Sequence, residues 1–335
     1  MQKPTCIELF AGAGGLSLGL EKANIDTNIF VEFNHDACET LRFNRPKWNI
    51  IEDDIKNISW ENINIDIVTG GFPCQSFSYA GKRLGFEDTR GTLFYEFARC
   101  VKETKPKIFL AENVKGLLTH DKGNTLKTII EVFEELGYEI QYNLLNAYDY
   151  GVPQKRERLI IIGTRKDMKI PFEWPQKEKE ENKKTTKEVF QNCPNSLGIK
   201  YSEKKKEIMD LIPMGGNWRN LPKDKQKEYM GKAYYSGGGK TGIAKRLDIN
   251  KPSPTIVCSP CQKQTERCHP FETRPINIRE SARIQTFDDN WHFCGGISSQ
   301  YTQIGNAVPV LLAQKLGEQL YAFIINNKEI SQCEN

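Results

Sequence analysis

The first half of the chain alternates short apolar runs with segments of helical hydrophobic spacing. Apolar runs at residues 5–10, 27–33, 49–51, 66–69, 107–114, 139–145 and 159–163 predict buried strands. Apolar residues three or four positions apart predict helices from residue 16 and over residues 92–103, 124–136 and 310–325, and residues 274–287 are expected to form another helix. Strands that alternate with helices predict an α/β fold.

The sequence GGFPCQSFS at residues 70–78 follows the apolar run at 66–69. Cys74 is therefore expected just beyond the carboxyl end of a strand, where open α/β folds bind their ligands. A cysteine is a nucleophile only as a thiolate, and its pKa falls beside cations such as Lys82, Arg83 and Arg90. The alternative is a small buried hydrophobic residue.

The ends of the first three strands predict a nucleoside pocket. The first strand runs into the glycine-rich turn at residues 11–15 and then into a helix, which brings backbone N–H groups close to a ligand. The second strand ends at Glu32, where an acid typically accepts hydrogen bonds from ribose hydroxyls, and Phe33 is placed to cover an adenine. Asp54 follows the third strand. The sequence near this pocket carries no Walker-type phosphate motif, so S-adenosyl-L-methionine fits better than a nucleoside triphosphate, and a dinucleotide is the alternative.

Two further motifs carry charged groups at strand ends. Glu112 closes the apolar strand at 107–114, which makes it either a paired carboxylate or a protonated general acid, unless it caps the next turn. Arg156 and Arg158 stand two residues apart at a strand start and are expected to point the same way, as suits a phosphate or a base oxygen. The basic, glycine-rich stretch at 79–91 is typical of a loop that closes over substrate.

The net charge of +4 is unevenly distributed over the 335 residues. Residues 177–275 hold 21 Lys and Arg against 12 Asp and Glu, a net charge of +9, whereas the remainder carries −5. A basic segment on a mildly acidic body indicates a polyanionic partner. Within this segment aromatic residues, glycines and cations alternate, as around Arg219, Lys240 and Arg246, and this composition is expected of loops that grip a nucleic-acid backbone.

The composition predicts a folded cytoplasmic protein of more than one domain. We find no apolar run of membrane length and no secretory signal, and ten scattered cysteines are typical of a reducing compartment. Cys258 and Cys261, with Cys268 and His269 nearby, invite a zinc interpretation. We favour no metal, because structural zinc sites use two well-separated ligand pairs.

Taken in order, these segments resemble the cytosine-5 DNA methyltransferases of bacterial restriction–modification systems. The likeness covers nearly the whole chain except residues 177–272, and it rests on residues 10–15, 32, 54, 73–75, 112–114, 154–158, 279–280 and 303–306. The resemblance implies a Rossmann-like, S-adenosylmethionine-dependent methyltransferase domain with a smaller target-recognition domain. We expect the catalytic and cofactor-binding domain at 1–176, the target-recognition domain at 177–273, and a hinge with a returning C-terminal helix at 274–330.

The resemblance also implies the role of each site residue. The catalytic residues would be Cys74, Glu112, Arg156 and Arg158. The cofactor contacts would be Phe10, Gly12, Gly14, Gly15, Leu16, Glu32, Phe33, Asp54, Ile55, Pro73, Leu93 and Asn306. The DNA contacts would be Gln75, Ser78, Lys82, Arg83, Arg90, Arg219, Lys240 and Arg246.

The implied reaction is methyl transfer from S-adenosyl-L-methionine to carbon 5 of a flipped-out cytosine in double-stranded DNA, through a covalent Cys74 adduct. It would protect DNA from a cognate restriction endonuclease, with which no stable complex is expected, and the enzyme would be a monomer. Three alternatives remain open from the sequence: a tRNA methyltransferase with the same motifs, a catalytically silent DNA-binding paralogue, and a nicotinamide oxidoreductase.

Overall fold

The computed structural model describes residues 3–72, 93–235 and 241–333, and the chain divides into two compact units. Unit 1 takes in residues 1–146, 157–177 and 310–335, and unit 2 takes in residues 147–156 and 178–309. Residues 274–309, which we expected with the returning C-terminal segment, group with unit 2. The functional roles of the three expected domains stay predictions.

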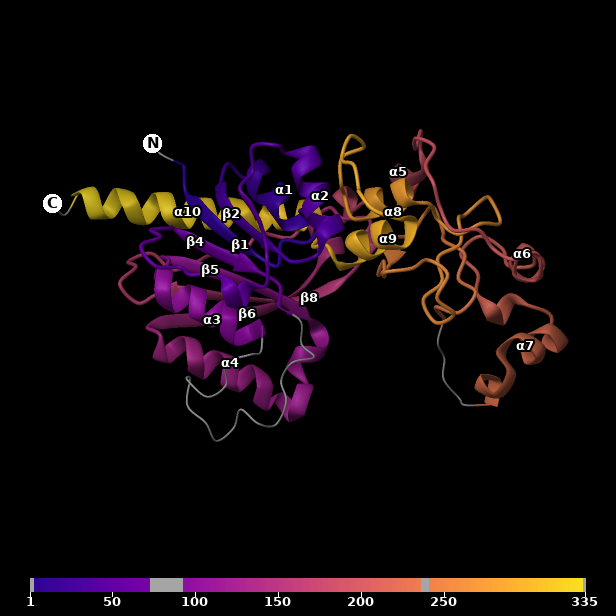
Figure 1. Ribbon diagram of the computed structural model, residues 1–335. Coiled ribbons are helices and arrows are strands. Elements are labelled where there is room, and N and C mark those ends of the chain that lie inside the picture. The colour runs from indigo at the N-terminus through magenta and orange to yellow at the C-terminus, as the bar shows by residue number, and fades with distance from the viewer. Residues whose placement is uncertain (1–2, 73–92, 236–240, 334–335) are drawn as a thin grey trace. The chain divides into compact units, whose positions relative to one another are not determined.

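Unit 1 is built on a seven-stranded sheet with helices on both faces (Figure 1). The strand order is β3-β2-β1-β4-β5-β8-β6, and all neighbours are parallel except that β8 runs antiparallel to β5 and β6. The strands are β1 Thr5–Leu9, β2 Asp26–Glu32, β3 Ile50–Glu52, β4 Ile67–Gly70, β5 Ile108–Val114, β6 Tyr138–Asn146 and β8 Glu157–Arg165. The helices are α1 Gly15–Lys22, α2 His35–Asn44, α3 Leu93–Thr104, α4 Asn124–Glu135 and α10 Val310–Cys333, with 3₁₀ turns at Ile55–Asn57, Lys115–Leu118 and His120–Gly123. The expected α/β fold is confirmed.

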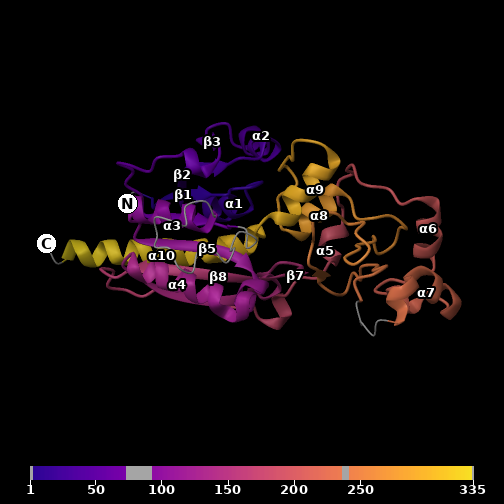
Figure 2. The ribbon, with the colours of Figure 1, turned by 60° about the horizontal axis from the view of Figure 1, so that its bottom comes forward.

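The two faces of this sheet are packed differently. Helices α3 and α4 cover one face, where five phenylalanine rings meet edge to face or tilted within one apolar cluster. The rings belong to Phe72, Phe94, Phe97, Phe109 and Phe133. Helices α1 and α10 lie together on the other face (Figure 2), so closely that a Cβ on Gly19 would lie 2.3 Å from the Cβ of Ala313. Only glycine at residue 19 permits this approach.

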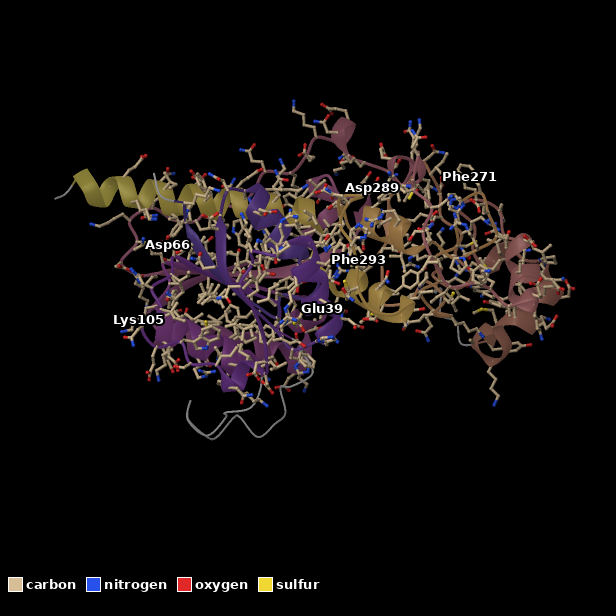
Figure 3. All side chains as sticks on the ribbon, turned by 45° about the horizontal axis from the view of Figure 1, so that its top comes forward. Glu39, Asp66, Lys105, Phe271, Asp289 and Phe293 are labelled. Carbon is tan, nitrogen blue, oxygen red and sulfur yellow. The ribbon has the colours of Figure 1, made fainter. Side chains whose placement is uncertain are left out.

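Asp66, labelled in Figure 3, ties together the amino ends of three strands and the last helix. Its carboxylate accepts a hydrogen bond from the backbone N–H of Thr5 at 3.2 Å and pairs with Lys107 at 2.7 Å and Lys328 at 3.2 Å. Burial opposes the charged form of Asp66, but Lys107, the Thr5 N–H and Lys328 together outweigh it and lower the pKa of Asp66. These contacts fasten the amino edge of the sheet and leave its carboxyl edge to carry the candidate site.

Unit 2 contains little regular strand among its described residues. Strands β7 Gln154–Lys155 and β9 Ser253–Pro254 pair in parallel. The helices are α5 Lys187–Phe190, α6 Glu203–Asp210, α7 Lys223–Met230, α8 Ile278–Ile284 and α9 Ile297–Asn306, with 3₁₀ turns at Ala147–Tyr150, Glu180–Asn182, Trp218–Asn220 and Gly231–Tyr235. A small apolar core forms around Met209, Ile212, Trp218, Leu221, Met230 and Ile243.

Two helix boundaries differ from those expected. Helix α8 begins only at Ile278, because the side chains and backbone N–H groups of Asn277 and Glu280 cap each other reciprocally there. Helix α10 continues to Cys333, eight residues beyond the expected end. Among the described residues, no helix combines the length and apolar character needed to cross a membrane.

Glu8 in β1 is an acid within the apolar run at 5–10 to which the sequence analysis gave no role, and its carboxyl is fully buried. Burial, with a smaller contribution from the nearby charge of Glu32, raises its pKa from 4.5 to about 8, although the nearby hydroxyl and backbone N–H of Ser17 act in the opposite direction. Oε2 of Glu8 has no hydrogen-bond partner within the part of the chain that the structure describes. The carboxyl is therefore mostly protonated at pH 7.

The Glu8 carboxyl makes stability fall as pH rises. Between pH 4.5 and 8 the folded protein keeps a proton that the unfolded chain releases, so the free energy of unfolding drops by about 1.4 kcal/mol per pH unit and the loss is complete above pH 8. Glu8→Gln needs no proton, so its stability relative to the wild type is expected to increase across this window. Urea unfolding at pH 5, 6.5 and 8.5 measures the difference, and parallel pH curves would contradict the assignment.

Candidate active site and cofactor site

The strand order of unit 1 reverses between β1 and β4. In open α/β sheets, ligands bind outside the carboxyl ends of the strands at such a reversal, because the connections leave in opposite directions and part there. The glycine-rich turn follows β1, and residues 71–72 follow β4. The two segments singled out in the sequence therefore flank the expected ligand position.

The turn after β1 needs glycine at the positions that the sequence suggested. Gly12 and Gly14 have φ values of 55° and 84°, in the left-handed region that glycine adopts without strain. Phe10, which precedes them, also has a positive φ of 56°. Gly14 caps helix α1 and has no side chain to accept from the first helical N–H groups. Gly15 and Leu16 begin the helix, so their N–H groups lie at its positive end and suit a negatively charged ligand group.

Glu32 at the end of β2 holds this turn in place. Its Oε2 accepts a hydrogen bond from the N–H of Gly12 at 2.8 Å, and its Oε1 accepts from the N–H groups of Phe33 at 3.0 Å and Asn34 at 2.8 Å. A carboxylate has about four acceptor positions. The three hydrogen bonds leave one acceptor position, at Oε2, for a donor such as a ribose hydroxyl. The neighbouring Phe33 side chain is 76% exposed, which leaves its ring face open to stacking.

The segment after β3 supplies the third strand end. Asp54 caps the 3₁₀ turn Ile55–Asn57 by accepting a hydrogen bond from the N–H of Lys56 at 3.1 Å, and its side chain is exposed. Ile55 is buried in the apolar cluster beneath it, and Leu93 at the start of α3 packs against the same cluster. We expected Asp54, Ile55 and Leu93 in one pocket. All three belong to unit 1, and Ile55 and Leu93 pack on the same apolar cluster.

Glu112 and Arg158 form an ion pair between adjacent strands. The Nε of Arg158 lies 2.7 Å from Oε1 of Glu112, and each side chain is only 13% exposed. In the antiparallel register of β5 and β8, Arg158 stands opposite Val114, two residues from Glu112 on the same side of the sheet. Glu112 thus has a charged partner, as we expected of an acid at the end of an apolar strand.

Gly71 brings the chain past this carboxylate. A Cβ at residue 71 would lie 3.0 Å from Oε2 of Glu112, so the absence of a side chain lets the end of β4 pass beside the acid. Asn113 fixes the next residue, since its Nδ2 donates a hydrogen bond to the Phe72 carbonyl at 2.9 Å. The Glu112 carboxylate therefore lies beside Gly71, which precedes Cys74 by three residues in the sequence. From the sequence we gave Gly71 and Asn113 no role of their own, although the pair of glycines at 70–71 was a signal of close approach.

Several expected site residues lie outside the described residues. They are Pro73, Cys74, Gln75, Ser78, Lys82, Arg83, Arg90 and Lys240.

Arg156 and Arg158 do not serve one common group, contrary to the expectation from their spacing. Arg156 belongs to unit 2, is 1% exposed, and donates hydrogen bonds to the carbonyls of Ile256 at 3.1 Å and Gly305 at 2.9 Å. Its neighbour Gln154 accepts from the N–H of Ile256 at 2.7 Å and donates to Gln285 at 2.6 Å. Arg156 thus joins distant segments of unit 2, and its catalytic role stays a prediction.

Arg246 and Arg219, both expected on DNA, differ sharply in the structure. Arg246 is 5% exposed, and its five N–H groups donate to five oxygens of unit 2. These are the carbonyls of Ile212, Met209, His269 and Glu272 and the hydroxyl of Thr273. Arg246 therefore has no donor left for a phosphate, which contradicts the expected DNA contact. Arg219 is exposed, with its guanidinium 5.5 Å from the centre of the Trp218 ring.

Three of the four candidate zinc ligands have hydrogen-bond partners in the structure. Cys258 donates to Oδ1 of Asn306 at 3.3 Å, Cys268 donates to the Glu272 carbonyl at 3.6 Å, and Nδ1 of His269 accepts from the N–H of Glu272 at 3.0 Å. Asn306 ends α9 in unit 2, and its contact with a cofactor stays a prediction. Elsewhere, within the described residues, His35, Glu39 and Glu52 converge on the surface, where Arg42 pairs with both carboxylates.

Comparison with known proteins agrees with this geometry. The sequence model of the family described as C-5 cytosine-specific DNA methylase matches residues 4–322. The chain is 53% identical over 329 residues to type II methyltransferase M.Eco47II of Escherichia coli, covering 94% of this chain and 78% of that protein. It is 53% identical over 327 residues to type II methyltransferase M.Sau96I of Staphylococcus aureus, covering 95% and 75%.

A likeness of fold extends further. The crystal structure of a Spodoptera frugiperda DNMT2 variant superposes with a TM-score of 0.62 at 19% identity, covering 95% of this chain and all of that chain. The seven-stranded sheet with its one antiparallel strand, the paired Glu112 and Arg158, and the matches along 4–322 lead to one conclusion: the chain belongs to the C-5 cytosine-specific DNA methylase family.

Proposed function

We propose that this DNA methyltransferase attaches the methyl group of S-adenosyl-L-methionine to carbon 5 of a flipped-out cytosine in a specific duplex sequence, through a covalent adduct at Cys74. The observation that carries the proposal is the Glu112–Arg158 pair at 2.7 Å, beside the Gly71 backbone that leads to Cys74. A fixed acid next to a cysteine-bearing segment is what activation of a pyrimidine ring requires.

The residues at the strand ends fit S-adenosyl-L-methionine. The remaining acceptor position of Glu32 suits a ribose hydroxyl, the exposed ring of Phe33 suits an adenine, and the amino end of α1 suits a carboxylate. When bound, the cofactor supplies a methyl group on a positively charged sulfur. We propose Phe10, Gly12, Gly14, Gly15, Leu16, Glu32, Phe33, Asp54, Ile55, Pro73, Leu93 and Asn306 as its contacts.

Carbon 5 of cytosine is too weak a nucleophile to accept a methyl group unaided. The Cys74 thiolate adds to carbon 6, and the electron pair of the 5,6 double bond becomes available at carbon 5. Glu112 hydrogen-bonds N3 with a proton on Oε2, while its other oxygen is held by Arg158. After carbon 5 has gained the methyl group, it loses its proton to a base, the carbon–sulfur bond breaks, and the thiolate returns.

The base must leave the duplex to reach Cys74, at a cost of a few kcal/mol. We propose that Gln75, Ser78, Lys82, Arg83 and Arg90 contact the DNA around it, and that Arg219 and Lys240 contact it from the target-recognition domain. The basic balance of residues 177–275 supports this division.

We also propose a physiological setting. The enzyme would act as a cytoplasmic monomer that protects DNA from a cognate restriction endonuclease without forming a stable complex with it. The likeness to type II methyltransferases supports the protective role, and the eight cysteines whose side chains the structure describes are all free, as suits a reducing compartment.

Cys74→Ser tests the covalent step. Bisulfite sequencing of DNA from cells that express the protein first identifies the methylated sequence. A duplex with 5-fluorocytosine at that position is then expected to trap the wild type covalently in the presence of S-adenosyl-L-methionine, because fluorine cannot leave as a proton does. Cys74→Ser should bind the duplex without trapping, and Cys193→Ser serves as the control that still traps. Trapping by Cys74→Ser, or methylation of tRNA but not of DNA, would overturn the proposal.

Substitution of the ion pair tests the acid. Glu112→Gln and Arg158→Met are each expected to lower kcat by about 100-fold or more, since general acid catalysis contributes about 10²–10⁴. The dissociation constant for S-adenosyl-L-methionine should change by less than about threefold. Because the two side chains act as a unit, the double variant should be little worse than either single one. Additive losses in single-turnover rates would contradict this coupling.

Arg219 and Arg246 provide a matched pair of arginines. Arg219→Ala should weaken DNA binding and make the slope of log K against log salt concentration less steep by about 1, with an unchanged melting temperature. Arg246→Ala should instead lower the melting temperature, because it leaves buried carbonyls without donors. The exposed Lys127→Ala in unit 1 is the control for charge alone. Fluorescence anisotropy at several salt concentrations measures the difference, and equal salt slopes for Arg219→Ala and wild type would refute the contact.

A further inference from the structure

One face of helix α3 carries three charged residues spaced three and four apart, namely Glu96, Arg99 and Glu103. The opposite face packs Phe94, Phe97 and other apolar side chains into the core. Residues at this spacing share a side of a helix. We refer to Glu96, Arg99 and Glu103 as the α3 clamp, because all three engage the backbone after β3 directly or through one another.

Arg99 is the centre of the clamp. Its Nη2 donates to the Ile55 carbonyl at 2.9 Å, and its Nη1 donates to the Ile58 carbonyl at 2.9 Å. Its Nε and Nη2 lie 2.8 and 2.7 Å from Oε2 of Glu96, which is largely buried. Oε2 of Glu103 lies 3.5 Å from Nη1. The planar guanidinium is therefore fixed by carboxylates on its own helix while it holds two carbonyls of another segment.

Those two carbonyls lie at the two ends of the 3₁₀ turn Ile55–Asn57. So short a turn has few hydrogen bonds of its own, and here they run from Asn57 to Asp54 and from Ile58 to Ile55. Glu103 extends the hold, since its Oε2 accepts from the backbone N–H of Trp60 at 3.3 Å. Asp54 directly precedes the turn and caps it. The position of its carboxylate therefore depends on the position of this backbone.

We propose that Arg99 is a positioning residue of the cofactor site, which sets the place of Asp54 and Ile55 by holding the turn after β3 to helix α3. The inference rests on the proposed function, since it takes Asp54 and Ile55 as cofactor contacts. It adds a residue that touches neither cofactor nor DNA. A lysine at residue 99 offers a single point of charge and cannot reproduce the two-carbonyl fork.

The test compares Arg99→Met, Arg99→Lys and the control Lys102→Met, which removes an exposed cation from the same helix. Isothermal titration with S-adenosyl-L-methionine should give a dissociation constant about tenfold higher for Arg99→Met and several-fold higher for Arg99→Lys, with no change for Lys102→Met. At saturating cofactor, kcat should stay within about twofold of wild type. Melting temperatures establish that each variant is folded at the assay temperature.

A double-mutant cycle with Asp54→Ala separates positioning from general stability. If Arg99 acts through Asp54, Arg99→Met should raise the dissociation constant by about twofold or less once Asp54 is already alanine. A full tenfold effect in that background, or a lowered melting temperature with an unchanged dissociation constant, would overturn the inference. If Arg99→Met does not fold, the same cycle is run with Arg99→Lys.

The experiment also distinguishes failure of the inference from failure of the proposed function. Wild type that binds S-adenosyl-L-methionine and methylates DNA, beside Arg99 variants with equal affinity, would refute the positioning role alone. Wild type that neither binds the cofactor nor methylates DNA would refute the proposed function itself.

Discussion

The carboxylate of Glu32 accepts backbone N–H groups from two different turns, and the candidate site depends on this constraint. The turn after β1 is held through Gly12, and the turn after β2 is held through Phe33 and Asn34. Charge-assisted hydrogen bonds of this kind are stronger than neutral ones. One acid therefore fixes the distance between the glycine-rich turn and the aromatic ring at residue 33, before any ligand is present.

The same arrangement recurs at the neighbouring strands. The turn after β3 is held by Arg99, and the end of β5 is held by the pair of Glu112 with Arg158. In each place a charged side chain from one element fixes the backbone or side chain of another. The apolar cluster beneath them, which includes Phe72, gives these polar contacts a rigid base. A site assembled from loops thus acquires the order of the sheet below it.

The fold was predictable because each strand of the sheet is an apolar run and each connection has helical spacing. The strands around Ile7, Val68 and Leu110 are buried on both sides, and such runs are visible without knowledge of the partner strands. Glu112 was also predictable, since an acid at the end of an apolar strand needs a specific partner. Its partner, Arg158, is distant in sequence, and only the antiparallel register of β5 and β8 brings the two together.

The errors and omissions share one cause. Arg246 lies in a stretch rich in glycine and aromatic residues, which indicates an exposed loop, yet its acceptors come from residues 209–212 and 269–273. The spacing of Arg156 and Arg158 predicts a common direction but says nothing about what lies there. The raised pKa of Glu8 likewise follows from burial by helix and strand, which the apolar run alone did not reveal. Local sequence specifies the element, whereas long-range packing decides the environment of each charge.

The position of α10 has a consequence for how the protein is made. This helix closes the face of the sheet on which α1 lies, with Ala313 against Gly19, although some 290 residues of chain separate the two. During synthesis α10 leaves the ribosome after residues 178–309 of unit 2, so the part of this face that α10 covers is the last to be closed. Unit 1 can therefore complete its fold only after α10 has emerged.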